Sequence, residues 1–467
     1  MRILLVAYDF PPIPSPQSLR WAYLARELSR LGHDVHVIAP DVGGYGDGGL
    51  PCLPDTVRVH RVYPGPLAFL FYRRPAAVPT SGGRNNGDVP AAEEENALLK
   101  RLLLALLAPL RSIVIDDPRR LSGLNWKGVI AEHVKAVYSY ALFPDHRAEW
   151  LPWARRVLRD LLPRLRPDVV VTSHEPACSL PLGQMAARAG FAWVADLGDP
   201  VLAGYTPPRW QRRARRLERE VCRDATLVSV TTRATAELLA ARHGLPAQHC
   251  VLLPQGFDAT FDPAQVPAPD FDTDILELLY TGSLYSFRTL EPLIKAVVEI
   301  PGVRLNVATL LAPAYLTEAG RVHSRSVRIL GFLPHESALA AQCRCDVLVN
   351  VANADSVQIP GKVHEYLQAR RPILHLRGPE RDAVSELIES VCVGWDVEAD
   401  PHALRVRLAD LIRRKREGVG LLECPQWAKT YQYSWQALAR RWTEEVDHAL
   451  SAATREELAD PERSRGQ

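Results

Sequence analysis

Lys362 and Glu365 lie three residues apart in the stretch IPGKVHEYLQARRPILHL, residues 359–376. Positions three apart share one face of a helix, so this cation and this carboxylate are expected to project together. Pro360-Gly361 marks the expected helix start, where free backbone N–H groups and the positive end of the helix dipole suit a diphosphate. Glu365, one turn further on, could accept two hydrogen bonds from ribose hydroxyls. A surface ion pair worth about a few tenths of a kcal/mol is the alternative.

Other polar side chains follow predicted strands. His174 and Glu175 come directly after PDVVVTS, and Asp196 and Asp199 lie in WVADLGDP. A histidine or carboxylate at the end of a strand could orient a substrate hydroxyl or take its proton, so these four residues are the candidate catalytic groups. Capping or hydrogen bonding within a loop is the alternative role for each of them.

The elements that must position these residues alternate between strands and helices. A strand over Ile3–Ala7 leads into an amphipathic helix over Ser18–Leu31, Gly32 ends that helix, and the strand DVHVIAP follows. Near-continuous apolar strands separated by helices recur to residue 256, and a second series begins after a Pro- and Asp-rich linker at 262–274. This pattern is typical of an α/β protein with two tandem doubly wound, Rossmann-like domains, whose ligands bind in a cleft beyond the carboxyl ends of the strands.

Two segments do not follow this alternation of strands and helices. Residues 79–97 are polar and of low complexity, which predicts disorder. Residues 98–115 are strongly apolar with basic residues interleaved. They could contact a membrane surface, as basic amphipathic helices do. A helix packed on the first domain is the favoured alternative.

Composition excludes several classes of protein. The formal net charge is only +2, so no nucleic-acid partner is expected. The eight cysteines are scattered without the spacing of a zinc or redox motif, and we predict no metal site. The N-terminal apolar run is too short for a signal peptide and no segment is long enough to span a membrane, so a cytoplasmic protein is expected. Arginine greatly outnumbers lysine, which is typical of a GC-rich bacterial genome.

Several motifs in order resemble those of GT-B glycosyltransferases, specifically family four, which are retaining enzymes that use sugar nucleotides. In the first domain these motifs are YDFPP, LRWAYLARELSRLGHDVHVIAP, FPDHRAEW, PDVVVTS and WVADLGDP. In the second they are LLYTGSL, ILGFLP, GKVHEYLQARRPIL and YSWQALARRW. The first-domain motifs resemble a bacterial subgroup of polysaccharide and secondary-metabolite enzymes, including those that glycosylate natural products.

The resemblance implies that the two domains bind different substrates. Residues 1–262, with an insertion at about 66–135, would bind the acceptor, and residues 275–425 would bind the nucleotide sugar. Residues 426–452 would form a helix that crosses back to the first domain, followed by a flexible tail at 453–467. The lobes would close over the donor and exclude water from the sugar.

The resemblance also assigns donor contacts. Glu365 matches the ribose-binding glutamate, Gly282 lets the backbone approach a phosphate, and Arg288 takes the place of a basic residue that neutralises the diphosphate. The backbone of Gly331, Phe332 and Leu333 would meet the edge of the base. The expected donor is a nucleoside diphosphate sugar, with UDP as the first nucleotide to test, and no other cofactor is expected.

The implied reaction is transfer of a sugar to a hydroxyl acceptor, with retention and without a metal ion. Three departures from the family pattern lie at the candidate site: Ser283 replaces an arginine, Val357 a glutamate and Gly198 another arginine. Ser283 stays in the donor site, where Lys362 could supply the missing charge. A catalytically silent glycosyltransferase-like partner subunit is the alternative that these departures favour, and a sugar-nucleotide epimerase is a further one. A dehydrogenase is excluded because the first turn lacks G-x-G-x-x-G.

Overall fold

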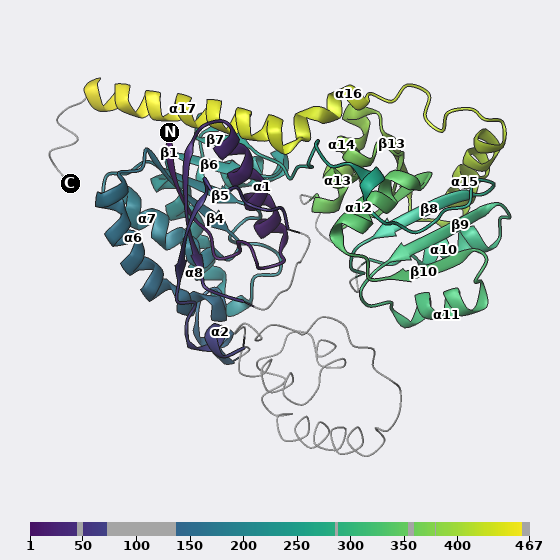
Figure 1. Cartoon of the computed structure of the whole chain (residues 1–467), viewed down its shortest axis with the longest axis horizontal. Coiled ribbons are helices and arrows are strands. Elements are labelled where there is room, and N and C mark those ends of the chain that lie inside the picture. The colour runs from purple at the N-terminus through teal and green to yellow at the C-terminus, as the bar shows by residue number, and fades with distance from the viewer. Residues whose placement is uncertain (44–49, 72–136, 285–287, 354–358, 379, 460–467) are drawn as a thin grey trace, which may run out of the picture.

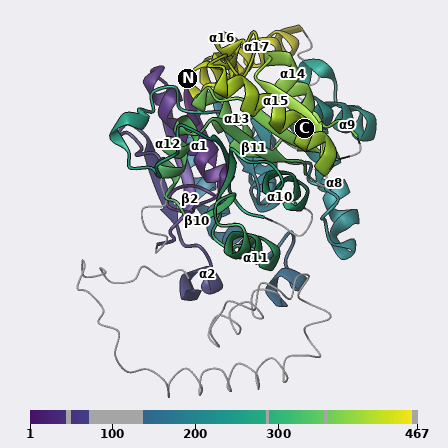
Figure 2. The same ribbon diagram turned by 90° about the vertical axis from the view of Figure 1, so that its right-hand side faces the viewer.

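The computed structural model forms two lobes that lie side by side (Figure 1), and the view turned by 90° brings the second lobe to the front (Figure 2). It describes residues 1–43, 50–71, 137–284, 288–353, 359–378 and 380–459. The predictions made for 79–97, for 98–115 and for Val357 therefore lie outside the described residues. Within the described residues, no helix is both long enough and apolar enough to cross a membrane.

The first lobe is built on a seven-stranded parallel sheet in the order β3-β2-β1-β4-β5-β6-β7. The strand order changes direction between β1 and β4, which is the switch point where doubly wound sheets bind ligands. The strands are β1 Arg2–Val6, β2 Asp34–Pro40, β3 Arg58–Val62, β4 Val169–His174, β5 Trp193–Leu197, β6 Leu227–Val230 and β7 Cys250–Leu252.

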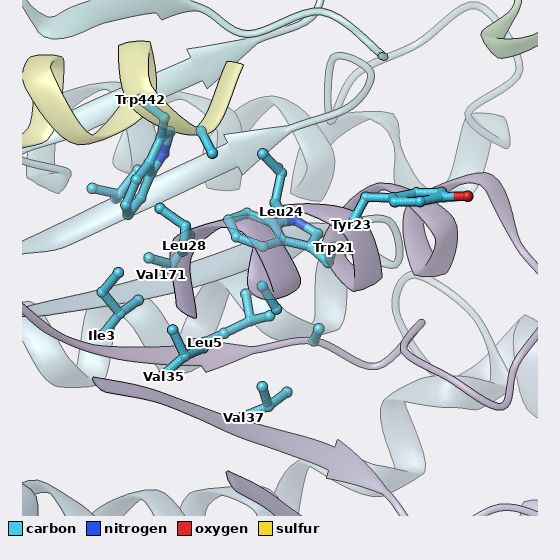
Figure 3. Packing of buried hydrophobic residues seen from close by; sticks show 14 of the residues in the cluster. Ile3, Leu5, Trp21, Tyr23, Leu24, Leu28, Val35, Val37, Val171 and Trp442 are labelled. Atoms are coloured by element: carbon cyan, nitrogen blue, oxygen red, sulfur yellow. The ribbon is translucent and has the colours of Figure 1, made fainter. Parts of the chain in front are cut away.

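Helices cover both faces of this sheet because successive residues of a buried strand point to opposite sides. Ile3 and Leu5 of β1 pack with α1 (Pro16–Arg30) and α17 (Trp435–Ala459), whereas Leu4 and Val6 pack with α6 (Leu151–Leu165) and α7 (Leu180–Arg188). Figure 3 shows the first of these layers, with Trp442 of α17 packed over α1. The first-lobe helices are α1 Pro16–Arg30, α2 Pro66–Phe71, α6 Leu151–Leu165, α7 Leu180–Arg188, α8 Pro208–Asp224 and α9 Arg233–His243.

The second lobe repeats the pattern with a six-stranded parallel sheet in the order β10-β9-β8-β11-β12-β13. Its switch point lies between β8 and β11. The strands are β8 Leu276–Thr281, β9 Val303–Ala308, β10 Val327–Gly331, β11 Val347–Val351, β12 Ile373–Arg377 and β13 Gly394–Glu398. The helices are α10 Glu291–Val298, α11 Ala314–Val322, α12 His335–Arg344, α13 Gly361–Ala369, α14 Ala383–Val391 and α15 Pro401–Arg416.

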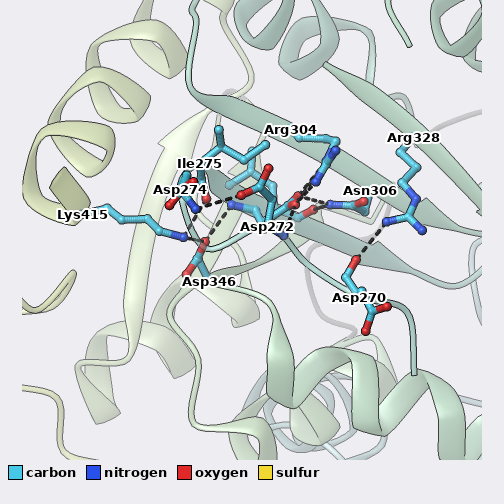
Figure 4. A network of polar contacts seen from close by, with 11 residues as sticks. Asp270, Asp272, Asp274, Ile275, Arg304, Asn306, Arg328, Asp346 and Lys415 are labelled. Atoms are coloured by element: carbon cyan, nitrogen blue, oxygen red, sulfur yellow. Dashed lines mark hydrogen bonds and ion pairs between the residues drawn. The ribbon is translucent and has the colours of Figure 1, made fainter. Parts of the chain in front are cut away.

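A polar network fixes the amino end of this second sheet (Figure 4). The buried carboxylate of Glu277 in β8 pairs with Arg304 of β9 and accepts a hydrogen bond from Asn306 Nδ2 at 2.7 Å. Asp346 accepts the backbone N–H of Glu277 at 2.8 Å and pairs with Lys415 of α15. This network lies at the opposite end of the strands from the switch point, which indicates a structural role.

The two sheets confirm the predicted fold class: an α/β protein with two tandem doubly wound domains. The chain crosses between the lobes twice at one place, where the backbone N–H of Phe257 donates to Tyr433 at 3.1 Å and that of Trp435 donates to Phe257 at 2.9 Å. After the short α16, Trp427–Thr430, the last helix α17, Trp435–Ala459, returns to the first lobe and packs on α1. The predicted helix ends at residue 452, whereas α17 continues to Ala459.

Asp258, next to this crossing, joins three elements. It pairs with Arg26 of α1 at 2.8 Å and accepts a hydrogen bond from Gln436 of α17 at 3.2 Å, while its backbone carbonyl accepts one from Gln368 of α13 at 2.8 Å. Burial disfavours its ionised form, but the hydrogen bonds from Arg26 and Thr260 outweigh burial and lower the pKa of Asp258 to about 2.

Asp258→Asn is expected to lower the free energy of unfolding by about 2 kcal/mol at neutral pH, because a pKa shift of one unit corresponds to about 1.4 kcal/mol. The lowered pKa means that the wild-type advantage is present above the unfolded-state pKa near 4 and is lost as the pH falls toward about 2. Urea unfolding of both proteins across this range measures the difference. Asp160→Asn, an exposed carboxylate on α6, is the matched control, and a difference that did not change with pH would contradict the assignment.

Candidate functional site

A cavity of about 270 Å³ lies between the two lobes, and we call it the interlobe cavity. The first lobe contributes the loop 14–16 together with Gln255, and the second lobe contributes His335, Lys362 and Glu365. The sequence therefore predicted correctly that Lys362 and Glu365 project together.

Helix α13 positions both side chains. Val363, Tyr366 and Leu367 are fully buried against the second sheet, whereas Lys362 and Glu365 face the cavity. Pro360 precedes the helix and has no side chain that caps its first N–H groups. The positive end of the helix dipole therefore lies beside Lys362.

Lys362 is held in place by the strand it faces. Its Nζ donates to the carbonyl of Thr281 at 3.2 Å and lies 3.6 Å from the centre of the Tyr280 ring. Burial and the positive charge of Arg288 lower the pKa of Lys362 well below its usual value, although Glu365 opposes this shift. An anion that entered the cavity would favour the charged form of this ammonium.

The switch point of the second sheet lies beside this lysine. Gly282 follows β8 with a φ of +112°, a left-handed conformation that glycine adopts readily. A side chain at this position would lie 3.8 Å from Lys362 Cδ. Arg288 hydrogen-bonds the side chain of Asn353, which follows β11 on the other side of the switch point. Gly282 and Arg288 thus lie near Lys362 at the switch point, although neither lines the interlobe cavity, and their contacts with a donor stay predictions.

Glu365 has a partner that the sequence analysis missed. Its Oε1 lies 2.9 Å from Nε2 of His335, the first residue of α12, and both side chains are mostly buried. His335 comes from another helix, 30 residues earlier in the chain. Its place in the sequence, just after the motif ILGFLP, was the available signal.

The remaining residues predicted for the donor side do not line this cavity. Ser283 is exposed, and its carbonyl accepts the Tyr280 hydroxyl at 2.9 Å. Gly331 has a φ of +73°, Phe332 is exposed, and Leu333 packs against the core of the second lobe. They precede His335 by a few residues, so their predicted contact with a base stays a prediction.

A larger cavity of about 600 Å³ lies in the first lobe, and we call it the first-lobe cavity. Tyr8 and Asp9, which follow β1, and His174 and Glu175, at the end of β4, line its wall. It therefore lies at the switch point of the first sheet. The loop after β1 separates the two cavities, since Ile13 lines this one and residues 14–16 line the other.

His174 and Glu175 line this cavity, and Asp199 lies beside it, within reach of Tyr205; their predicted catalytic roles stay predictions. The hydroxyl of Tyr205 donates to Glu175 Oε1 at 2.6 Å and also lies 3.0 Å from Asp199 Oδ2. Burial and the two carboxylates raise the pKa of Tyr205, so it remains a donor. Burial lowers the pKa of His174, although Glu175 opposes this, and the neutral imidazole could therefore accept a proton from a hydroxyl.

The sequence analysis did not single out three other charged residues of this cavity. Arg147 makes a bidentate pair with Asp145, at 2.7 Å for the shortest contact, and lies 3.5 Å from Asp9. Burial raises the pKa of Asp9, and Arg147 opposes that shift. Asp9 directly follows a strand, so the rule that identified His174 could also have identified it.

Asp196 was predicted to orient a substrate hydroxyl or take its proton. Its side chain does not reach either cavity, so the structure does not place it for this role. It is fully buried and pairs with the equally buried guanidinium of Arg20 at 2.9 Å. Trp21 Nε1 and the Ser229 hydroxyl also donate to it, at 2.9 and 2.6 Å. Both carboxylate oxygens are therefore occupied by structural partners.

Gly198, one of the departures from the family pattern, has a steric explanation. A side chain added here would lie 1.8 Å from Nε2 of Gln17 in α1. The side chain of Gln17 would have to move to make room, and the nearest backbone atom, the carbonyl oxygen of His174, would lie 3.2 Å away.

No three metal-ligating side chains cluster anywhere in the described part of the chain.

Comparisons with known proteins agree with this architecture. Residues 113–261, less than half of the chain, match the model of Glycosyltransferase Family 4. No curated protein sequence matches the chain.

The solved structure of a glycosyltransferase from Rickettsia africae is similar to this chain, with 13% identity and a TM-score of 0.57, over 96% of this chain and 98% of that one. TarM is similar with 9% identity and a TM-score of 0.57, over 95% of this chain and 98% of that one. A UDP-GlcNAc 2-epimerase from Methanocaldococcus jannaschii has 11% identity and a TM-score of 0.52, over 96% and 100%. At such identities the likeness shows the fold. The chain thus has the fold of these GT-B structures, and its residues 113–261 are similar to Glycosyltransferase Family 4.

Proposed function

We propose that this protein transfers a sugar from a nucleoside diphosphate sugar to a hydroxyl acceptor, with UDP as the expected nucleotide. The observation that carries the proposal is the placement of Lys362 and Glu365 on one cavity between the lobes, beside the N-terminus of α13. This places a cation and free N–H groups for a diphosphate next to a carboxylate for a ribose.

The reaction develops negative charge on the diphosphate as it leaves the sugar. Preorganised positive groups stabilise such charge, and the chain offers Lys362, Arg288 and the helix dipole of α13. These groups support departure of the diphosphate without a metal ion. The resemblance to family four supports retention, with the acceptor attacking from the face that the diphosphate leaves.

The first-lobe cavity supports transfer over the two alternative functions. An epimerase that acts on its sugar nucleotide alone does not need a second cavity at the switch point of the first sheet. His174 and Glu175 line that cavity and are suited to orient a hydroxyl. A silent partner subunit would have no need for the charged residues gathered around Lys362.

Glu365→Ala is expected to abolish stabilisation of the protein by its nucleotide. Ligand at about 100 times its dissociation constant adds about 2.7 kcal/mol of stability, which a thermal shift resolves. We would test UDP, GDP, ADP and dTDP with their common sugar conjugates. His335→Ala is the matched control because it removes the partner of Glu365 and keeps the carboxylate. The nucleotide that stabilises the wild type should therefore still raise the melting temperature of this variant.

Each outcome of this screen separates the functions. If no nucleotide or sugar conjugate raises the melting temperature of the wild type, donor binding is contradicted and the silent subunit is favoured. If a sugar conjugate is bound, nuclear magnetic resonance of the product distinguishes transfer with retention from inversion. Conversion of the free sugar nucleotide without an acceptor would instead identify an epimerase.

A further inference from the structure

Tyr280 of β8 lies directly against the ammonium group of Lys362. The proposed function assigns this ammonium to the diphosphate, so the inference rests on that function. Nζ of Lys362 is 3.6 Å from the centre of the Tyr280 ring. The ring is completely buried, and its hydroxyl donates to the carbonyl of Ser283 at 2.9 Å. Packing and this hydrogen bond therefore fix the ring, and its electron-rich face meets the cation.

The ammonium group is held by neutral partners. Besides the ring of Tyr280, it contacts the carbonyl of Thr281, to which it donates at 3.2 Å. Glu365 projects from the same face of α13, but its Oε1 lies 2.9 Å from Nε2 of His335. In the described part of the chain, no ion pair joins Glu365 to Lys362. Since neither a carbonyl nor a ring carries a negative charge, the lysine is held without being neutralised.

The charged groups around this ammonium act in opposite directions. Burial and then the positive charge of Arg288 lower the pKa of Lys362, whereas Glu365 raises it. The positive end of the α13 dipole also disfavours a cation here. An aromatic ring attracts a desolvated cation more strongly than an exposed one, so Tyr280 favours the charged form where burial disfavours it. The more distant ring of Tyr366, 6.0 Å from Nζ, acts in the same sense.

We propose that Tyr280 is a positioning residue: its ring holds the Lys362 ammonium in its charged form at the interlobe cavity and leaves that charge for the diphosphate. An ammonium has three N–H donors, and the carbonyl of Thr281 and the ring use two of them. The third donor serves the diphosphate. A carboxylate in place of the ring would also hold the ammonium, but it would neutralise the lysine and repel the diphosphate. The neutral ring avoids both effects.

Phenylalanines at position 280 that carry from zero to three ring fluorines test this role. Fluorine withdraws electron density from the face of the ring and hardly changes its shape, so packing is kept while attraction for the cation declines. The chain has only seven lysines, so labelling with carbon-13 at Cε allows nuclear magnetic resonance to follow Lys362 as the pH is raised. Lys362→Met assigns the signal. In the free protein, the pH midpoint of Lys362 is expected to fall with each added fluorine.

Simple substitutions give the size of the effect. Tyr280→Leu removes the ring and should lower the proton affinity of Lys362 by on the order of tenfold relative to Tyr280→Phe, which keeps it. Trp395→Leu is the matched control, because it removes a ring of the same lobe that lies 5.5 Å from the Arg407 guanidinium and lines neither cavity. It should leave the midpoint of Lys362 unchanged. Circular dichroism confirms folding, and the fluorinated series decides the question if Tyr280→Leu does not fold.

UDP binding gives a second readout that a merely structural role would not produce. Above the midpoint of Lys362, Tyr280→Leu should bind UDP about tenfold more weakly than Tyr280→Phe, because binding must then charge a lysine that the ring no longer supports. Below the midpoint the two variants should bind UDP alike. Calorimetric titration across this range measures both affinities.

The proposal is overturned if the midpoint of Lys362 is constant across the fluorinated series, or if Tyr280→Leu weakens UDP binding equally at every pH. Failure here is distinguishable from failure of the proposed function, because the midpoint is measured without a nucleotide. A wild type that binds UDP with a constant midpoint in the series overturns the role of Tyr280 alone. A falling midpoint in a chain that binds no nucleotide overturns donor binding, and with it the role of Tyr280 in the reaction.

Discussion

Asp196→Ala is expected to lower the free energy of unfolding by about 3–5 kcal/mol, because it leaves a buried cation without its partner. The guanidinium of Arg20 is fully buried, and it also donates to the carbonyls of Leu253 and Pro254 at 2.8 and 2.7 Å. Those carbonyls keep the arginine in place, so the charge cannot move into water when the carboxylate is removed. Urea unfolding followed by circular dichroism measures the loss.

Two controls separate this buried ion pair from a general effect of mutation. Asp160→Ala removes an exposed carboxylate and should change stability by no more than about 0.5 kcal/mol. Arg20→Met/Asp196→Asn removes both charges and should be less destabilised than Asp196→Ala, because no unpaired charge remains. If Asp196→Ala were fully stable but inactive, the catalytic role predicted from the sequence would be restored.

Lys362→Met is expected to reduce turnover by about 100- to 1,000-fold, as loss of one preorganised group at a developing charge does. The same substitution should weaken UDP binding, because Lys362 lies at the N-terminus of α13 where the diphosphate is proposed to bind. Steady-state kinetics with the donor found in the thermal screen measures the first effect, and calorimetric titration with UDP measures the second.

The lowered pKa of Lys362 predicts that UDP binding is coupled to protonation of this side chain. Above this lowered pKa the free protein holds a neutral lysine, and the diphosphate favours the charged form. UDP binding should therefore take up a proton, and affinity should fall as the pH rises through the lowered pKa. Calorimetry in two buffers of different ionisation enthalpy detects this uptake. Lys362→Arg keeps its charge throughout this range, so equal proton uptake in that variant would contradict the assignment.

Local spacing was enough to predict that Lys362 and Glu365 project together. They share a face because helix geometry fixes it, and Val363, Tyr366 and Leu367 had to face the sheet. Gly282 and Arg288 were found because they follow a strand that local hydrophobicity identifies. The location of each of these residues could be predicted from residues only a few positions away in the sequence.

Residues whose role depends on distant partners could not be predicted in this way. Asp196 follows the same strand-end pattern as His174, but its partner Arg20 lies 176 residues away in the sequence. Only the packing of α1 on the sheet shows that this carboxylate points into the core. Tyr205 belongs to no pattern that sequence spacing reveals, and His335, although it follows the motif ILGFLP, meets Glu365 only through the tertiary fold.

Helix α17 has a consequence for how the chain folds during synthesis. Trp435, Leu438 and Trp442 belong to the same core as Trp21 of α1, and the two tryptophans Trp21 and Trp442 meet edge to face with ring centres 6.5 Å apart. The first lobe emerges from the ribosome before the second, yet this part of its core is supplied by a helix that follows the second lobe in the chain. Domains usually fold in the order of their synthesis, but here the apolar side of α1 remains uncovered until the second lobe has been completed.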